Sequence, residues 1–281
     1  MSDSVESTHI TVTPVTAAIG AEVSGVDLRD DLDDATVARI RKALLDHLVL
    51  FFRGQDLDDD AHLKFALRFG PLSISPLATK YQDSPAVTVL DQVAPKGEGA
   101  DEWHSDNTFM PNPPLGSILR CVQLPETGGD TCFASMYAAY DALSPAIRQM
   151  VDGLTAVHDV SKVMRKAIAA GHTNLDMPAM QEKFPPIEHP VARVHEETGR
   201  KALFVNRNCT THIVGLSERE SETLLPFLLD HVRSPEFQCR LHWEPGTVAF
   251  WDNRSIQHYA VADYTERRIM RRVTIDPPVD V

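Results

Sequence analysis

The stretch GTVAFWDNRSIQHYA, residues 246–260, joins an apolar run to a turn-like Asp-Asn-Arg and then to a histidine. Its first half predicts a buried strand, because it is short, apolar and bounded by Pro245-Gly246 before it and turn residues after it. Strand-like segments recur nearby, at residues 189–196, 201–206, 238–243 and 267–275. A helix predicted over 217–232 interrupts them. The C-terminal part therefore predicts a core built mainly from β-strands.

The N-terminal part mixes both kinds of element. Asp33-Asp34 offers an N-cap for a helix in which Val37, Ile40 and Leu44 recur at helical spacing. The other predicted segments are short strands over 9–28, a buried strand over 49–54, a helix over 56–70, strands and loops over 71–129 and a helical section over 135–182.

This order of elements predicts the fold class. Because strands come before and after a helical insertion, we expect an α+β fold with a mainly β core, a sandwich or barrel with helices added outside. No repeat or low-complexity linker divides the chain, so we expect a single domain over 9–281 and a flexible tail over 1–8.

Composition excludes several classes of protein. Lys and Arg number 27 against 40 Asp and Glu, a net charge of −13, which disfavours nucleic acid and anionic lipid as partners. No run approaches the roughly 18 apolar residues of a membrane span, and the N-terminus lacks a signal-peptide pattern. We therefore expect a cytoplasmic protein. Its four cysteines, Cys121, Cys132, Cys209 and Cys239, form no CxxC pair and are expected to be buried thiols.

A candidate metal site lies in EWHSDNTF, residues 102–109. On an extended segment His104 and Asp106 point to the same side, and His258 offers a third ligand. Two imidazoles and one carboxylate can hold iron on one face and leave positions open for an organic chelator and dioxygen. An HxD pair alone is weak evidence, and the ordinary alternative is a solvated loop.

The segment RRIMRR, residues 267–272, contains four arginines in a predicted strand. Alternation puts Arg268, Met270 and Arg272 on one face and Arg267, Ile269 and Arg271 on the other. One alternative is an edge strand blunted by charge. If the first face points inward, two guanidinium groups lie beside the metal and can each bind an anion. Alternation alone does not decide between these alternatives.

HSD, GGDT (128–131), WDNRSIQHYA and RRIMRR, together with FFRGQ (51–55), occur in an order that resembles the TauD/TfdA family of iron(II)- and 2-oxoglutarate-dependent dioxygenases. The resemblance implies a double-stranded β-helix, or jelly roll, that holds Fe²⁺ through His104, Asp106 and His258. It also implies that Thr131 and Arg268 bind the cosubstrate 2-oxoglutarate and that Arg272 binds the anionic end of the substrate. Dioxygen would be consumed, and succinate and CO₂ formed. Beyond the metal and its ligands, no catalytic residue is expected, and a homodimer or homotetramer is expected.

The sequence specifies the substrate less closely than it specifies the metal and the cosubstrate. In PLSISPLA, residues 71–78, the family's taurine-contacting histidine and tyrosine are replaced by Ser75 and Ala78. We expect a small anionic compound: taurine or another sulfonate, a sulfate ester or a carboxylate. Asn107, Phe109 and Ser75 are expected to face it, with core packing as the alternative for Phe109. Two further alternatives are a non-catalytic anion-binding jelly roll and a metal hydrolase with the same three ligands.

Overall fold

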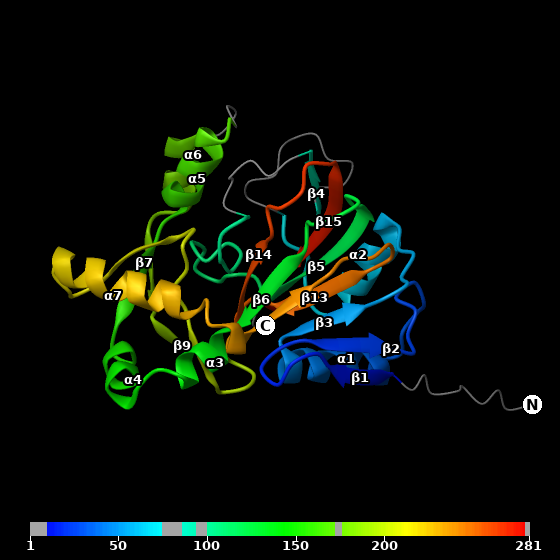
Figure 1. Cartoon of the computed structure of the whole chain (residues 1–281), viewed down its shortest axis with the longest axis horizontal. Helices are drawn as coiled ribbons and strands as arrows, with labels where there is room; N and C mark the ends of the chain where they lie inside the picture. Colours follow the sequence, from blue (N-terminus) through cyan, green and yellow to red (C-terminus); the bar gives the residue numbers. More distant parts are fainter. Residues whose placement is uncertain (1–9, 75–85, 94–99, 172–175, 279–281) are drawn as a thin grey trace, which may run out of the picture.

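The computed structural model describes residues 10–74, 86–93, 100–171 and 176–278 (Figure 1). A seven-stranded sheet forms its centre, with the strand order β1-β2-β3-β13-β5-β15-β4. The neighbours in it are antiparallel except β2 and β3. Its strands are β1 (Thr11–Pro14), β2 (Ala21–Ser24), β3 (Val49–Phe52), β4 (Val87–Gln92), β5 (Gly116–Gln123), β13 (Val248–Asp252) and β15 (Arg268–Ile275).

A three-stranded sheet, ordered β12-β6-β14, packs against this sheet. Its strands are β6 (Thr131–Ser135), β12 (Gln238–Leu241) and β14 (Ile256–Ala260). Phe133 of β6 reaches across the interface, with ring centroids 5.8 Å from both Phe51 of β3 and Trp251 of β13. The largest apolar cluster of the described residues therefore includes the interface between the two sheets and continues beyond it.

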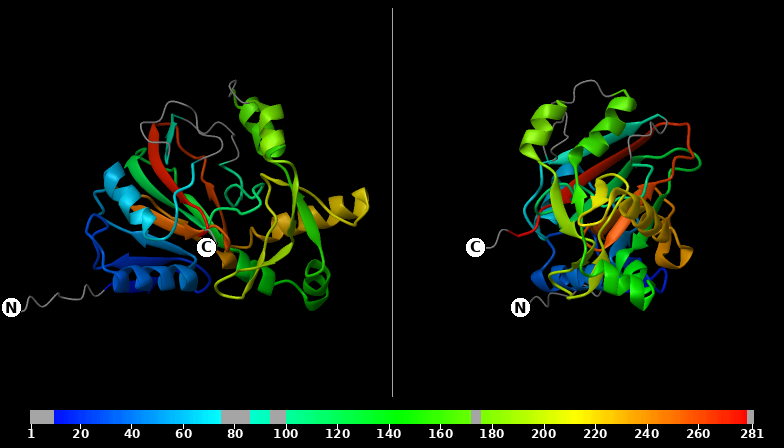
Figure 2. Two further views of the ribbon diagram at one scale, coloured as in Figure 1. Left: turned by 180° about the vertical axis from the view of Figure 1, so that it is seen from behind. Right: turned by 90° about the vertical axis from the view of Figure 1, so that its left-hand side faces the viewer.

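The other face of the seven-stranded sheet is covered by α1 (Asp34–His47) and α2 (Asp59–Leu67) (Figure 2). Strand β13 shows why: Ala249 and Trp251 point into the core between the sheets, whereas Val248 and Phe250 pack with the helices. Both helices begin at an aspartate that accepts a backbone hydrogen bond, which satisfies an otherwise unpaired N–H group. Both helices agree with the sequence prediction.

The predicted helical section over 135–182 is wrong in one respect. It contains α3 (Met136–Asp141), α4 (Pro145–Val151), α5 (Val160–Ala169) and α6 (Met177–Lys183), but β7 (Thr155–His158) separates α4 from α5. TAVH alternates between partly and fully buried positions and pairs with strands more than 25 residues later. Such distant pairing leaves little local signal in the sequence.

Smaller elements complete the described part of the chain. Helices α5 and α6 lie side by side at one end of the molecule (Figures 1 and 2). The remaining elements are β8 (Ile187–Pro190), β9 (Ala192–Val194), β10 (Lys201–Leu203), β11 (Thr210–Ile213), α7 (Glu218–His231) and the 3-10 helix η1 (Pro235–Phe237). None of the helices in the described ranges combines the length and apolar character needed to cross a membrane.

Candidate metal centre

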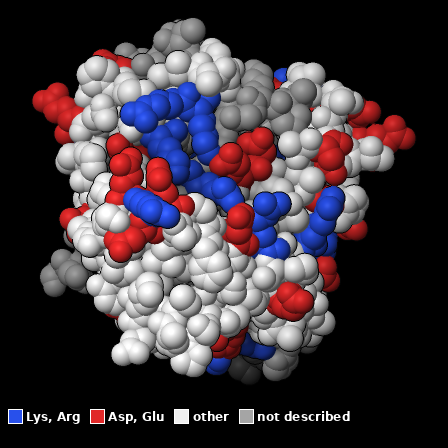
Figure 3. Space-filling view, turned by 60° about the vertical axis from the view of Figure 1, so that its left-hand side comes forward, with Lys and Arg blue, Asp and Glu red and all other residues white. Residues whose placement is uncertain are grey.

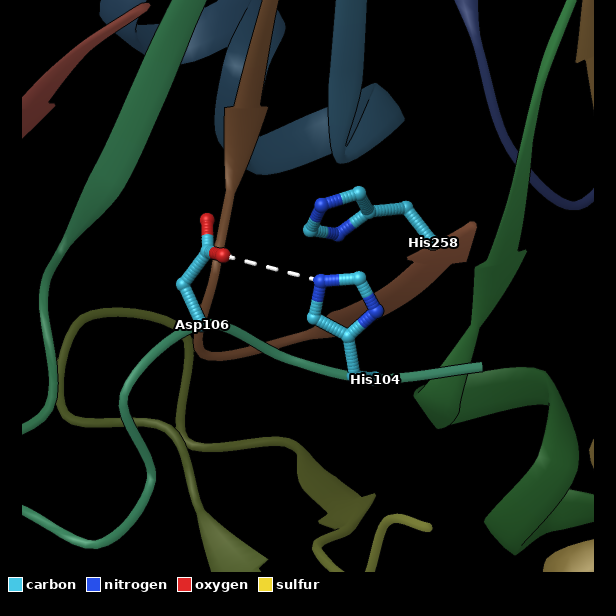
Figure 4. Close-up of side chains that lie close together, drawn as sticks. All are labelled: His104, Asp106 and His258. Carbon is cyan, nitrogen blue, oxygen red and sulfur yellow. Dashed lines mark ion pairs between the residues drawn. The ribbon is translucent and has the colours of Figure 1, made fainter. Parts of the chain in front are cut away.

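Two segments far apart in the sequence bring three candidate ligands together (Figure 4). His258 lies on β14, and His104 pairs with it as an isolated antiparallel bridge. His104 N donates to His258 O at 3.0 Å, and His258 N donates to His104 O at 2.8 Å. One ligand atom from each of His104, Asp106 and His258 lies within 4.8 Å of the others. The structure therefore brings together the three residues that the sequence singled out.

The protonation states in this cluster suit a divalent cation. Burial lowers the pKa of His104, and it lowers the pKa of His258 to about 3. Burial alone would raise the pKa of Asp106, but Arg272 and the two imidazoles lower it to about 2. The site therefore presents two neutral imidazoles and an ionised carboxylate near neutral pH, the forms that bind metals.

Hydrogen bonds leave ligand atoms available. His104 Nδ1 lies 2.7 Å from the carbonyl oxygen of Glu102, so Nδ1 carries the proton and Nε2 keeps its lone pair. His104 Nε2 lies 3.7 Å from Asp106 Oδ1. His258 Nδ1 is buried without a hydrogen-bond partner among the described residues. Nitrogen and oxygen donors without a thiolate fit a non-haem iron site better than a closed structural zinc site.

Arg268, at the start of β15, is 4% exposed, and its Nε and Nη2 have no hydrogen-bond partner in the described part of the chain. The Trp243 and Tyr264 rings lie about 6 Å from its guanidinium carbon. Trp243 Nε1 also donates to Thr131 Oγ1 at 3.0 Å, so one indole connects the two residues predicted to bind 2-oxoglutarate. A buried guanidinium with unpaired donors fits an anionic ligand, since buried charges are normally paired.

The GGD turn packs against Arg268. Gly129 has φ +73, and a Cβ atom added there would lie 3.1 Å from Arg268 Cδ. Its N–H donates to Asp263 Oδ1 at 2.8 Å. Glycine is needed at this position both for the left-handed backbone and for the close approach.

Strand β15 resolves the alternatives left open for RRIMRR. It lies between β5 and β4, so the edge-strand interpretation is wrong. Met270 belongs to the core between the sheets, and Arg272 Nη1 donates to Asp106 Oδ1 at 3.0 Å. Arg271, on the opposite face, contacts Asp59 of α2. The face that carries Arg268 and Arg272 therefore points toward the candidate metal centre.

The predicted substrate-facing residues have mixed outcomes. Asn107 is half-buried in a left-handed conformation, with φ +50. Phe109 is 2% exposed and packs edge to face on Phe184, which agrees with the core-packing alternative. Ser75 and Ala78 lie outside the described residues, so their role stays a prediction.

Other contacts of the centre escaped the sequence prediction. Ser117 Oγ donates to Asp106 Oδ2 at 3.3 Å, and the buried side chain of Asn253 bonds to the backbone of Asp106. Asn253 lies inside the quoted WDNR motif, but nothing local in the sequence shows that it meets a residue 147 positions away.

Comparisons with known proteins identify the family of the chain. The family model described as "Taurine catabolism dioxygenase TauD, TfdA family" matches residues 11–274. An alpha-ketoglutarate-dependent sulfate ester dioxygenase of Pseudomonas putida is 41% identical over 97% of this chain and 91% of its own. An alkylsulfatase of Acinetobacter baylyi is 40% identical over 93% of this chain and 83% of its own.

Solved structures of related dioxygenases are also similar to this chain. The crystal structure of a taurine dioxygenase from Burkholderia xenovorans superposes with a TM-score of 0.81 and 39% identity, covering 97% of this chain and 91% of that one. A crystal structure of AAD-2 in complex with Mn(II) and N-oxalylglycine has a TM-score of 0.82 and 28% identity, covering 96% and 98%. From its family match, its relatives and its fold, this chain belongs to the TauD, TfdA family of taurine catabolism dioxygenases.

Proposed function

We propose that the protein is an iron(II)- and 2-oxoglutarate-dependent dioxygenase that oxidises a sulfate ester with an apolar organic group. As a member of its family it is a 2-oxoglutarate-dependent dioxygenase acting on anionic organic compounds. One observation carries the iron assignment: the largely buried cluster of His104, Asp106 and His258 lies on the core side of the strand that carries Arg268, whose Nε and Nη2 have no hydrogen-bond partner among the described residues. We also interpret the seven-stranded and facing three-stranded sheets as the two halves of a double-stranded β-helix, and residues 9–281 as one domain.

Each residue has a proposed role. His104 Nε2, an imidazole nitrogen of His258 and the Asp106 carboxylate would hold Fe²⁺, leaving the other positions for ligands. Arg268 would bind the distal carboxylate of 2-oxoglutarate, and the Thr131 hydroxyl would donate to the same cosubstrate. Arg272 would bind the sulfate group. When bound, the iron supplies the activation of dioxygen, and the protein supplies binding, orientation and exclusion of water.

Charge near the centre supports an anionic substrate. Lys and Arg side chains gather in a band on one face of an otherwise acidic molecule (Figure 3). Lys166 of α5 contacts the carboxylate of Glu102, whose carbonyl bonds to His104. Burial lowers the pKa of Lys162, and the nearby positive charges of Lys166 and Arg207 lower it further. Such a band raises the local concentration of an anion.

An apolar cluster beside the same loop supports the organic part of the substrate. Its buried part contains Phe109, three residues after Asp106, and the partly buried Met110, Met177 and Met180 give it an adaptable surface. Its buried members are Phe109, Val160, Met164 and Cys209, and its partly buried members are Met110, Val163, Met177, Met180 and Phe184. Two of the relatives are named for sulfate esters or alkyl sulfates, which agrees with this combination of charge and apolar surface.

The proposed reaction hydroxylates the sulfate ester, and the product then releases sulfate. Dioxygen and 2-oxoglutarate give succinate and CO₂, and one oxygen atom enters the C–H bond next to the ester oxygen. The hydroxylated ester then breaks its C–O bond to sulfate, giving an aldehyde and hydrogensulfate. Sulfate, aldehyde and succinate should therefore appear in equal amounts.

Two measurements test this proposal. Anaerobic addition of Fe²⁺ and 2-oxoglutarate should produce a visible charge-transfer band that Asp106→Ala abolishes, and an unchanged band in the variant would contradict the ligand assignment. A panel of alkyl sulfates, sulfonates including taurine, and aryloxy carboxylates should then be followed by succinate formation. Greater succinate formation from taurine than from any alkyl sulfate would overturn the substrate assignment.

The same panel separates the two alternatives. A non-catalytic anion-binding module would form no succinate with any member. A metal hydrolase would release sulfate without dioxygen and without 2-oxoglutarate. A cytoplasmic location and a homodimeric or homotetrameric state stay predictions, which fractionation and light scattering of the purified protein would test.

A further inference from the structure

Asn253 binds both backbone polar groups of Asp106. Its Oδ1 accepts from Asp106 N at 2.6 Å, and its Nδ2 donates to Asp106 O at 2.9 Å. The same Nδ2 also lies 3.3 Å from Pro114 O. The side chain is completely buried, with 0% exposure. A single amide thus serves as the hydrogen-bond partner that a strand would otherwise provide.

This contact continues the pairing between the two ligand segments. His104 pairs with His258 through two backbone bonds, and Ser105 Oγ donates to Ile256 O at 2.7 Å. At Asp106 the hydrogen-bond partner is a side chain and not backbone: it is the amide of Asn253, which lies in the turn directly before β14. Three consecutive residues, 104 to 106, are therefore fixed to the segment 253–258, which carries the third ligand.

The position of the Asp106 carboxylate depends on this arrangement. Arg272 and Ser117 hold its two oxygens, at 3.0 Å and 3.3 Å, but neither contacts the backbone of Asp106. Directly after it, Asn107 adopts φ +50, so the chain turns sharply at the ligand. Without the Asn253 contact, the Asp106 carboxylate would keep Arg272 and Ser117 as partners, but the backbone that carries it would no longer be held in place.

We infer that Asn253 is a positioning residue of the metal centre, which sets the location of the Asp106 carboxylate relative to the two imidazoles. The inference rests on the proposed function, because it takes the three residues as metal ligands. Outer partners of metal ligands contribute about 10- to 100-fold to metal affinity. A loss of that size is expected when the Asn253 contact is removed.

Asn253→Asp tests this with little change in shape. The variant keeps an acceptor for Asp106 N but replaces the donor with a carboxylate oxygen that faces Asp106 O and Pro114 O. Isothermal titration of Mn²⁺ into the metal-free full-length protein should show a Kd about 10- to 100-fold weaker than that of the wild type. The visible spectrum of the Co²⁺ form should also change, because the position of one oxygen ligand changes.

Gln55→Glu is the matched control. Gln55 also uses one amide to bind backbone on both sides, accepting from Leu28 N at 2.8 Å and donating to Val26 O and Arg53 O at 3.1 Å. Gln55→Glu should also lower the melting temperature, by less than Asn253→Asp because Gln55 is only half-buried. It should leave the Mn²⁺ Kd within about threefold of the wild-type value, since Gln55 touches no ligand segment. Asn253→Ser, which removes the contact without adding charge, is measured in parallel in case the charged variant does not fold.

Failure of the proposed function and failure of the Asn253 inference give different results. If the wild type fails to bind Mn²⁺, or if Asp106→Ala binds it as well as the wild type, the proposed function fails. Suppose instead that the wild type binds Mn²⁺ and Asp106→Ala does not. If the folded Asn253→Asp and Asn253→Ser variants then keep the wild-type Mn²⁺ Kd and Co²⁺ spectrum, Asn253 only stabilises the fold and the inference is overturned.

Discussion

The two faces of β15 hold arginines in opposite situations. On the outer face, Arg271 contacts Asp59, which Arg120 also binds at 2.6 Å. On the inner face, Arg268 is more deeply buried, yet its Nε and Nη2 have no hydrogen-bond partner among the described residues. A paired cation is explained by the fold itself. A buried cation with unpaired donors points to a ligand, since a protein gains nothing in stability by leaving such a charge uncompensated.

The largest effect should come from removing Arg268, the buried cation whose Nε and Nη2 have no hydrogen-bond partner among the described residues. Arg268→Met is expected to raise the KM for 2-oxoglutarate by about 30- to 1,000-fold, because a buried charge partner contributes about 2–4 kcal/mol to binding. The free energy of unfolding without ligand should stay the same or rise. Steady-state kinetics and urea unfolding measure the two quantities.

Arg271→Met is the control on the outer face. It should leave the KM for 2-oxoglutarate unchanged and lower stability by about 0.5–1 kcal/mol, since the pair with Asp59 is partly solvated. Equal increases of the KM for 2-oxoglutarate in Arg268→Met and Arg271→Met would contradict different roles for the two faces of β15.

Arg272 lies on the inner face but is paired with Asp106, so it should behave differently from Arg268. Arg272→Met is expected to raise the KM for the proposed sulfate ester substrate by about tenfold or more, as for a lost charge-assisted hydrogen bond. The KM for 2-oxoglutarate should change far less. Both are measured at saturating metal, because the variant also removes a partner of a metal ligand.

Arg272→Lys should recover only part of the loss, since an ammonium group cannot bind sulfate through two parallel bonds. Parallel increases in both KM values for Arg272→Met would contradict separate roles for the two inner arginines.

Gly129 offers a smaller perturbation of Arg268. Gly129→Ala introduces strain at φ +73 and a Cβ atom 3.1 Å from Arg268 Cδ, so it should raise the KM for 2-oxoglutarate by about tenfold. Gly199→Ala introduces the same kind of strain at φ +68 with no atom within 4 Å of the new Cβ. Both should lose about 1 kcal/mol of stability, and only the first should change the KM. A similar KM for 2-oxoglutarate in both variants would show that the position of the Arg268 side chain does not depend on the turn at Gly129.

A further prediction concerns pH and the outer face, and it does not involve the metal centre. Burial, followed by the positive charge of Arg120, lowers the pKa of His62 in α2 to about 4, from 6.5 in an unfolded chain. Between these values the unfolded state binds more protons, so stability should fall as the pH drops from 6.5 toward 4. His62→Gln keeps a donor for Ile118 O and should flatten this dependence of the urea midpoint. Parallel curves for both proteins would exclude His62 as the cause.

Much of this organisation could be predicted from the sequence. The three candidate ligands, the helices beneath the sheet and the inner face of RRIMRR follow from local spacing combined with the family resemblance. Alternation by itself did not show which face of β15 is inward. That depends on β5 and β4 flanking the strand, which is a property of the assembled sheet.

Two features had no local signal. β7 is four residues long and follows a helix closely, and it is a strand because β8 and β11 pair with it. The contact of Asn253 with Asp106 joins positions 147 residues apart, and an asparagine in a turn has many ordinary roles.

The pairing of His104 with His258 has a consequence for protein synthesis. A growing chain carries two of the three ligands early, but it has no third ligand until residue 258 leaves the ribosome, and β15 with both inner arginines follows later. Two ligands on an unpaired loop bind a metal weakly. A metal ion held by all three residues would therefore enter after the chain has folded.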